Sequence, residues 1–97
     1  MTIQWAPLAL ERIVEIGAYI HRENPSAAER WIRQVFERVK QLEDFPLSGK
    51  KNKDTDRKDI RELSWKNYRI IYRIDREVVS ILTVRHAKQI LPIEEIR

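Results

Sequence analysis

The chain has 97 residues, of which 42% are hydrophobic and 35% are charged, and it contains no cysteine. This length suffices for one hydrophobic core but excludes a second domain or a large enclosed active-site cavity, so we expect a single domain over residues 1–97 with its site on a surface or in a shallow groove. The lack of cysteine excludes a disulfide framework, a thiolate zinc site and a cysteine nucleophile.

The charge balance favours partners that carry negative charge. Lysine and arginine exceed aspartate and glutamate by 19 to 15, which gives a net charge of +4, and this balance permits binding to nucleic acid or to an acidic protein. No signal segment and no run of about 18 apolar residues is visible, so we expect a cytoplasmic protein that does not contact a membrane. Phosphate-binding glycine loops and metal-ligand motifs are also missing, so neither a cofactor nor a metal is expected.

The first half of the chain predicts a short strand and then two helices. Met1–Ala6 alternates weakly in hydropathy, and Pro7 is well placed in the first turn of a helix that runs to about Arg22. Its apolar positions follow helical spacing: Leu10, Ile13, Val14, Gly17 and Ile20. Asn24 can cap a second helix that starts near Pro25, and Ser26 with Glu29 offers an alternative capping box.

The second helix has its own apolar stripe, and it ends before a Pro-containing and Gly-containing segment at residues 45–49. The stripe comprises Ala28, Trp31, Ile32, Val35, Phe36, Val39 and Leu42. Two such helices joined by a short turn form an antiparallel hairpin.

The second half of the chain predicts a loop and three strands. Residues 50–59 contain no apolar side chain, which indicates a solvated, mobile loop that either serves solubility or contacts nucleic acid. Strands are then expected at Ile60–Trp65, Tyr68–Asp75 and Val78–His86, the first two joined by a Lys66-Asn67 turn in which Asn67 tolerates the left-handed conformation. The last strand is apolar on both faces and is therefore expected to be central. A tail follows at residues 87–97, and its hydrophobic residues are expected to dock on the chain's own core or on a partner.

This order of elements predicts the α+β class. We expect the arrangement β-α-α-β-β-β, with a helical hairpin packed on one face of a small, mostly antiparallel sheet.

The element order and three local motifs resemble the RelE/ParE toxin family over residues 1–92. In that family the second helix commonly ends with a leucine, a short spacer and a proline followed three residues later by glycine, as at Leu42, Pro46 and Gly49. An Arg-x-Leu strand start, a Tyr-Arg-aliphatic-aliphatic-Tyr strand and a Val-x-His-x-basic ending follow in order. They correspond here to Arg61–Leu63, Tyr68–Tyr72 and Val84–Lys88.

The resemblance implies a toxin of a type II toxin–antitoxin pair that is held inactive by a cognate antitoxin, with which it forms a hetero-oligomer. RelE-like members cleave messenger RNA in the ribosome, whereas ParE-like members poison DNA gyrase. A third alternative is a non-toxic relic that still binds an antitoxin.

The residues present favour the ParE-like branch. RNA cleavage needs a proton acceptor, a proton donor and cations near the developing charge, and RelE-like nucleases place lysines and arginines on the sheet. Arg69 keeps the sheet arginine, but Glu62 stands where a lysine would be expected and Ala87 stands at the position of a further arginine. If the chain is a metal-independent nuclease, Arg69 and His86 are the catalytic candidates, because imidazole titrates near neutrality.

In the ParE-like reading the protein does no chemistry and binds gyrase through exposed basic residues. The candidate contacts are Arg61, Arg69, Arg85, His86 and Lys88. For the arginines the alternative role is a salt bridge across neighbouring strands, for example with Glu62, Asp75 or Glu77.

The antitoxin is expected to place an amphipathic helix beside the helical hairpin and to add a strand to the sheet edge. Candidate antitoxin contacts are Trp5, Leu8, Tyr19 and Trp31, although packing in the core is the commoner role of a tryptophan at helical spacing.

Overall fold

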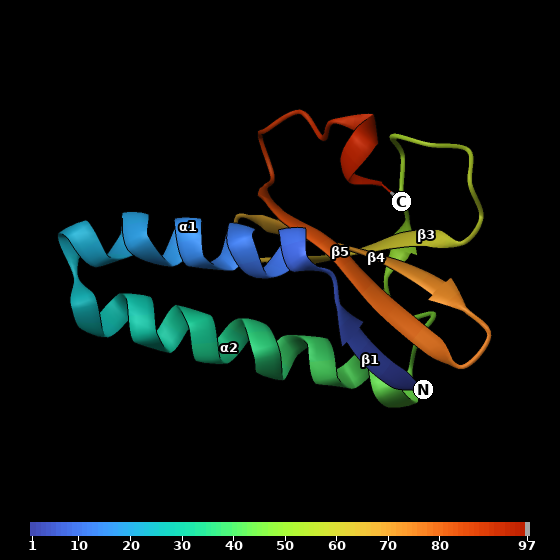
Figure 1. Ribbon diagram of the computed structural model, residues 1–97, viewed down its shortest axis with the longest axis horizontal. Coiled ribbons are helices and arrows are strands. Elements are labelled where there is room, and N and C mark those ends of the chain that lie inside the picture. Colours follow the sequence, from blue (N-terminus) through green and yellow to red (C-terminus); the bar gives the residue numbers. More distant parts are fainter. Residues whose placement is uncertain (97) are drawn as a thin grey trace.

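The computed structural model describes residues 1–96, in which two α-helices pack on one face of a five-stranded sheet (Figure 1). The strands are β1 Thr2–Trp5, β2 Lys50–Lys51, β3 Ile60–Trp65, β4 Tyr68–Asp75 and β5 Val78–His86, and the helices are α1 Pro7–Glu23, α2 Pro25–Asp44 and the 3₁₀ turn η1 Ile93–Glu95. The sheet order is β1-β5-β4-β3-β2. The predicted α+β arrangement is confirmed.

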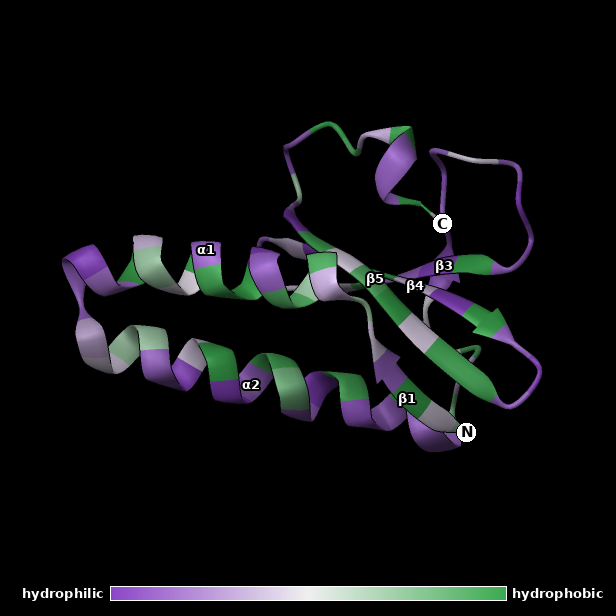
Figure 2. Ribbon diagram, viewed as in Figure 1, coloured by the Kyte–Doolittle hydropathy of each residue, from purple (hydrophilic) through white to green (hydrophobic). Residues whose placement is uncertain are grey.

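Strand β5 is an interior strand of the sheet, between β1 and β4, and the middle strand of the five is β4. It pairs in parallel with β1, where Thr2 lies opposite Val78, and antiparallel with β4, where Tyr68 lies opposite His86. Figure 2 shows that β5 is hydrophobic over most of its length. An apolar strand with neighbours on both sides and packing on both faces buries the most apolar surface, which explains why its pattern does not alternate.

Both helices begin with a proline, as predicted. Proline is tolerated there because the N–H groups of the first turn have no acceptor within the helix, so the missing N–H costs no hydrogen bond. Of the two capping alternatives for α2, the chain uses Asn24: its side-chain oxygen accepts a hydrogen bond of 3.1 Å from the N–H of Ala27. The N–H of Asn24 also closes α1 by donating to the carbonyl of Ile20. One residue therefore ends the first helix and starts the second.

The predicted apolar stripe of α1 is wrong at two positions. The helix buries Ala9, Ile13 and Gly17 against the rest of the core, while Leu10 and Val14 are 42% and 67% exposed. Ala9 and Gly17 permit this rotation because small residues let the helix approach its neighbours closely, and a Cβ at Gly17 would lie only 2.9 Å from Ile32 Cδ1. The rotation leaves apolar side chains on the outer surface of the hairpin.

The two faces of the sheet are covered differently. The helices cover the face that carries Ile70, Tyr72, Ile81 and Val84. The opposite face is covered by the C-terminal segment, which folds back beside β5 (Figure 1). The hydrophobic cluster on that face consists of Ile60, Ile71, Leu82, Leu91 and Ile96. The tail thus docks on the chain's own sheet, and Arg97 lies outside the described residues.

The predicted loop at residues 50–59 is wrong at its beginning. Lys50–Lys51 forms the edge strand β2, with Lys50 opposite Glu62 of β3. Asn52 is buried, because its side-chain nitrogen donates to Glu62 Oε1 at 3.0 Å. A hydrogen bond to a buried charged residue thus orders Asn52, although the surrounding sequence contains no apolar residue that would predict burial.

The predicted left-handed residue of the β3–β4 turn is also misplaced. Lys66 has φ 54° and Arg76, in the next turn, has φ 55°, whereas Asn67 is not in this region. Trp65 lies opposite Tyr68, so the turn consists of only two residues, Lys66 and Asn67. A left-handed residue at the first of these positions gives the turn a twist that matches the twist of the two strands.

Replacement of Tyr72 by phenylalanine should destabilise the fold by about 1–3 kcal/mol. The buried Tyr72 hydroxyl donates to the carbonyl of Pro46 at 2.7 Å and accepts from the N–H of Gly49 at 3.0 Å, so its removal leaves two backbone groups unpaired. Urea unfolding of Tyr72→Phe measures the loss, with Tyr19→Phe at a 69% exposed position as the control. Equal midpoints for the two variants would contradict this role of the hydroxyl.

Candidate functional site

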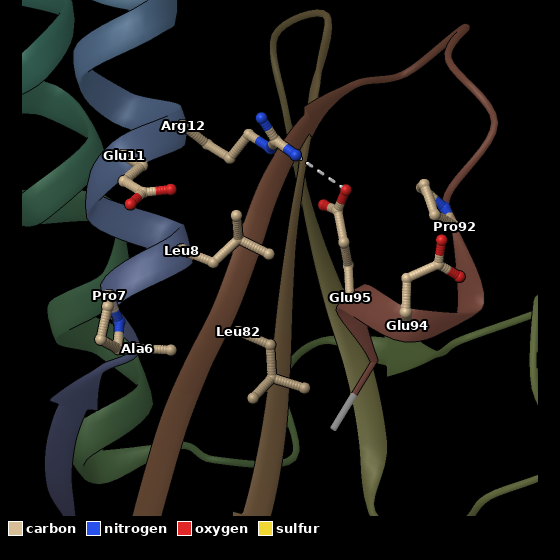
Figure 3. Close-up of a pocket in the computed structure, with 9 residues that line it drawn as sticks. All are labelled: Ala6, Pro7, Leu8, Glu11, Arg12, Leu82, Pro92, Glu94 and Glu95. Atoms are coloured by element: carbon tan, nitrogen blue, oxygen red, sulfur yellow. Dashed lines mark hydrogen bonds and ion pairs between the residues drawn. The ribbon is translucent and has the colours of Figure 1, made fainter.

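A trough runs between α1 and the strand and tail beside it. Its first compartment, with a volume of about 600 Å³, lies between the start of α1, β5 and η1 (Figure 3). It is lined by Ala6, Pro7, Leu8, Glu11, Arg12, Leu82, Pro92, Glu94 and Glu95. Leu8 and Leu82 form an apolar floor, and carboxylates stand along the walls (Figure 3).

The second compartment continues along α1 toward the end of β5, with a volume of about 480 Å³. It is lined by Arg12, Glu15, Ile16, Tyr19, Tyr68, Val84, Arg85, His86 and Gln89. Burial, and next the neighbouring Tyr19, raise the pKa of Tyr68. Three of the predicted contact residues, Tyr19, Arg85 and His86, meet in this compartment.

The two compartments share Arg12, and an ion-pair cluster stands between them. Arg12 reaches from α1 to the tail and donates to Glu95 Oε2 at 3.0 Å (Figure 3). Arg85 donates to both oxygens of Glu95, and Thr83 Oγ1 lies 2.7 Å from Oε1. One carboxylate thus joins α1, β5 and η1.

The Glu95 carboxylate is buried, with 6% exposure. Burial alone would raise its pKa, but the hydrogen bonds from Arg85, Thr83 and Arg12 together lower the pKa to about 2. The carboxylate is therefore ionised throughout the physiological range, and it neutralises cations that a solvent-facing sheet would otherwise present.

Arg69 lies beside Arg85 on the same face of the sheet, since the two residues are opposite each other in β4 and β5. It is only 6% exposed and is bound by Glu62, at 2.9 and 3.1 Å, and by Asp54. The expectation of an exposed Arg69 is therefore wrong, because the strand-to-strand salt bridge with Glu62, considered above as the alternative role, buries it. Each of these two neighbouring arginines is neutralised by an acidic residue of a covering segment: Asp54 in the loop and Glu95 in the tail.

His86 ends β5 on the helical side and packs edge-on against Tyr68, with ring centroids 5.6 Å apart. Its Nδ1 accepts a hydrogen bond from the N–H of Lys88 at 3.2 Å. This contact holds the proton of a neutral imidazole on Nε2. Lys88 itself is exposed just beyond the compartment.

Arg61 lies apart from this group. It is on β3, and its guanidinium donates to the carbonyl of Gly49 at 2.7 Å, next to the edge strand β2. The five basic residues predicted as target contacts therefore do not form one continuous surface.

The predicted antitoxin contacts divide in the same way. Tyr19 is 69% exposed and lines the second compartment, and Leu8 lines the first. Trp5 is half-buried and stacks on Phe36 with ring centroids 4.6 Å apart. Trp31 is only 5% exposed and packs against Tyr68, so the expectation of a surface contact is wrong there and core packing is found instead.

Comparison with known proteins shows the family. Residues 3–91 match the sequence profile described as the ParE toxin of the type II toxin–antitoxin system parDE. The chain belongs to the ParE toxin family. A curated relative of this toxin, named "Putative toxin Y4kP", from Sinorhizobium fredii, is 42% identical over 92 residues, which cover 93% of this chain and 92% of the relative.

Solved structures share the fold of the toxin. One, described as a chromosomal ParDE toxin–antitoxin system from P. aeruginosa, has a TM-score of 0.78 at 18% identity and covers 91% of this chain and 97% of that one. A second, the RelBE2 toxin–antitoxin complex from Mycobacterium tuberculosis, has a TM-score of 0.54 at 24% identity and covers 88% and 95%. Within residues 1–96, none of the toxin's helices is long and apolar enough to cross a membrane.

Three residues of this cluster, Arg12, Thr83 and Glu95, are not predicted from the sequence. Arg12 stands among the polar positions of an amphipathic helix, and Glu95 lies within the hydrophobic tail, 83 positions further along the chain. No local pattern joins the two, and only the return of the tail to the sheet brings them together.

Glu95 should make the toxin's stability depend on acid. Its folded-state pKa of about 2 is below the ordinary 4.5, so its contribution is present above about pH 4.5 and is lost as the pH falls toward 2. The difference corresponds to roughly 3 kcal/mol. Urea unfolding at pH 7 and pH 3 should therefore show a smaller acid-induced loss for Glu95→Gln than for the unmodified chain.

The exposed Glu29 supplies the control for this measurement. Glu29→Gln should keep the acid dependence of the unmodified chain. If Glu95→Gln also keeps it, the ion-pair cluster does not stabilise the fold as described.

Proposed function

We propose that this toxin inhibits DNA gyrase in the cytoplasm by binding rather than by chemistry, and that a cognate antitoxin neutralises it in a hetero-oligomer. Membership of the ParE family supports this proposal. The structural neighbours are themselves described as a ParDE system and as a toxin–antitoxin complex.

The arginines of the sheet are neutralised by carboxylates, and this observation supports a function without catalysis. Cleavage of RNA needs cations free to approach a phosphate whose charge increases in the transition state. Arg69 is bound by Glu62 and Asp54, and Arg85 by Glu95. Three carboxylates on this face would repel a phosphate, so the arrangement favours a protein-binding toxin over a nuclease.

His86 alone does not supply a nuclease site. Its Nδ1 is engaged by the backbone of Lys88, and its ring lies against Tyr68. A nuclease would also need a second proton-transfer group beside the imidazole, and the arginines of the neighbouring sheet positions, Arg69 and Arg85, are held by carboxylates. The exposed Lys88 and the edge of His86 are better suited to contact a protein surface, and they are the target contacts that we favour.

Arg85 differs from Lys88 as a predicted target contact, because its side chain is bound within the protein. Its two hydrogen bonds to Glu95 occupy its guanidinium in the described chain. A charge reversal at Arg85 would repel Glu95 and disturb the tail, so Lys88 is the cleaner position for testing target binding.

Purified toxin should stabilise the cleaved-DNA complex of gyrase and should leave RNA intact. Lys88→Glu is expected to lower the yield of cleaved DNA at least tenfold, because it reverses the charge of an exposed contact without touching the ion-pair cluster. Gel analysis of supercoiled plasmid after protease treatment measures this yield.

Lys58→Glu makes the same charge change in the exposed part of the loop before β3 and serves as the matched control. It should retain full activity. Cleavage of messenger RNA, lost in His86→Ala, would replace the proposal with the nuclease alternative, and a folded toxin without either activity would indicate an antitoxin-binding relic.

A further inference from the structure

The Glu95 carboxylate occupies a site with the features of a ligand-binding site. Arg12 and Arg85 come from different elements and converge with Thr83 on one carboxylate. Planar guanidinium groups recognise carboxylates in this way, with parallel hydrogen bonds that fix orientation. Yet the carboxylate belongs to the short 3₁₀ turn η1, which follows the exposed residues 87–90, and not to a strand or helix of the core.

The attachment of the tail is limited. Residues 87–90, the first part of the tail, are all exposed, and Ile90 and Ile93 are 88% and 70% exposed. Besides Glu95, the tail buries the two hydrophobic side chains Leu91 and Ile96. Within residues 1–96 these three are the buried residues of the tail, and the charged one stands in the middle of the trough.

The surroundings of the site favour an acidic segment. Arg12 also binds Glu15, but this glutamate is 60% exposed and offers little competition. The Nε atom of Arg12 is buried, and no acceptor within residues 1–96 reaches it. The site therefore has a donor that the tail does not use and that a better-fitting partner would.

The trough continues on both sides of the charged cluster. From Leu8 to Tyr19 along α1 it measures roughly 16 Å, given the rise per residue of a helix. An extended peptide of about five residues spans that length. Such a peptide would reach the apolar floor at Leu8 and Leu82 on one side and the rings of Tyr19 and Tyr68 on the other.

We propose that the trough beside α1 binds an extended acidic segment of the antitoxin, whose glutamate or aspartate replaces Glu95 on Arg12 and Arg85. Aliphatic residues of that segment flank the carboxylate and pack on Leu8 and Leu82 on one side and on the rings of Tyr19 and Tyr68 on the other. This inference rests on the proposed function only for the source of the segment.

The tail then acts as a built-in competitor. A covalently attached ligand has an effective concentration in the millimolar range, so a weakly complementary acidic peptide does not displace it. A segment that fills both compartments gains contacts that the tail does not make. The competition makes binding selective for a partner that spans the whole trough.

A peptide with the tail's own sequence, Lys88–Ile96 with an amidated end, is the probe for this site. Full-length Glu95→Gln is expected to bind the labelled peptide at least tenfold more tightly than the unmodified chain, because the internal competitor has lost its charge. Fluorescence anisotropy measures the affinity. A peptide with glutamine at the position of Glu95 and with Glu94 kept is the matched control and should not bind, and Arg85→Gln in the Glu95→Gln chain should abolish binding.

Equal affinity of folded Glu95→Gln and unmodified chain, or equal binding of the two peptides, would overturn the proposal. If Glu95→Gln does not fold, Ile96→Ser takes its place, because it loosens the tail and leaves the charged cluster intact. These measurements contain no gyrase and no antitoxin, so failure of gyrase inhibition is distinguishable from failure of the site.

The source of the segment is tested in the complex with the cognate antitoxin. The N–H groups of Glu95 and Ile96 donate to the carbonyls of Pro92 and Ile93 at 3.0 Å each. Hydrogen exchange at these two amides should speed up at least tenfold when the antitoxin displaces the tail. Unchanged exchange in a saturated complex would show that the antitoxin binds elsewhere and would overturn this assignment.

Discussion

One buried carboxylate connects the parts of this protein that local structure leaves separate. Glu95 binds Arg12 of α1 together with Arg85 and Thr83 of β5, and so it fixes the tail on the sheet face that the helices do not cover. Burying a charge is costly unless partners satisfy it, and three donors do so here. Because the tail depends on this contact, the cover over Leu82 and the shape of the trough depend on it too.

The same constraint supports the proposal that this toxin acts by binding rather than by catalysis. Arg69 and Arg85 lie side by side on neighbouring strands, on the same face of the sheet. They would form a phosphate-binding surface if they were free. Here the loop and the tail each supply an acidic residue, Asp54 and Glu95, that binds one of them. A ParE-family toxin built in this way retains the fold shared with a RelBE complex and uses its sheet for internal contacts. Its exposed surfaces are the parts of the molecule that we propose for binding proteins.

The sequence predicted the regular elements well because their signals are local. Proline at helix starts, the Asn24 cap and the change from helical to alternating spacing after residue 59 placed the helices and the three long strands within one or two residues. The errors fall where distant residues decide. Asn52 is buried against Glu62, ten residues further along the chain, and Leu10 is exposed because Ala9 and its neighbours set the rotation of α1. The trough was invisible for the same reason, although Tyr19, Arg85 and His86 at its edge were among the predicted contacts.

Pulse labelling of DNA and protein synthesis, minutes after induction of this chain alone in bacteria, tests the central claim most directly. A toxin that binds gyrase and performs no chemistry lowers DNA synthesis first, while protein synthesis continues. An immediate collapse of protein synthesis with DNA synthesis intact would contradict this account, and it would mean that the carboxylates on Arg69 and Arg85 give way to RNA in the cell.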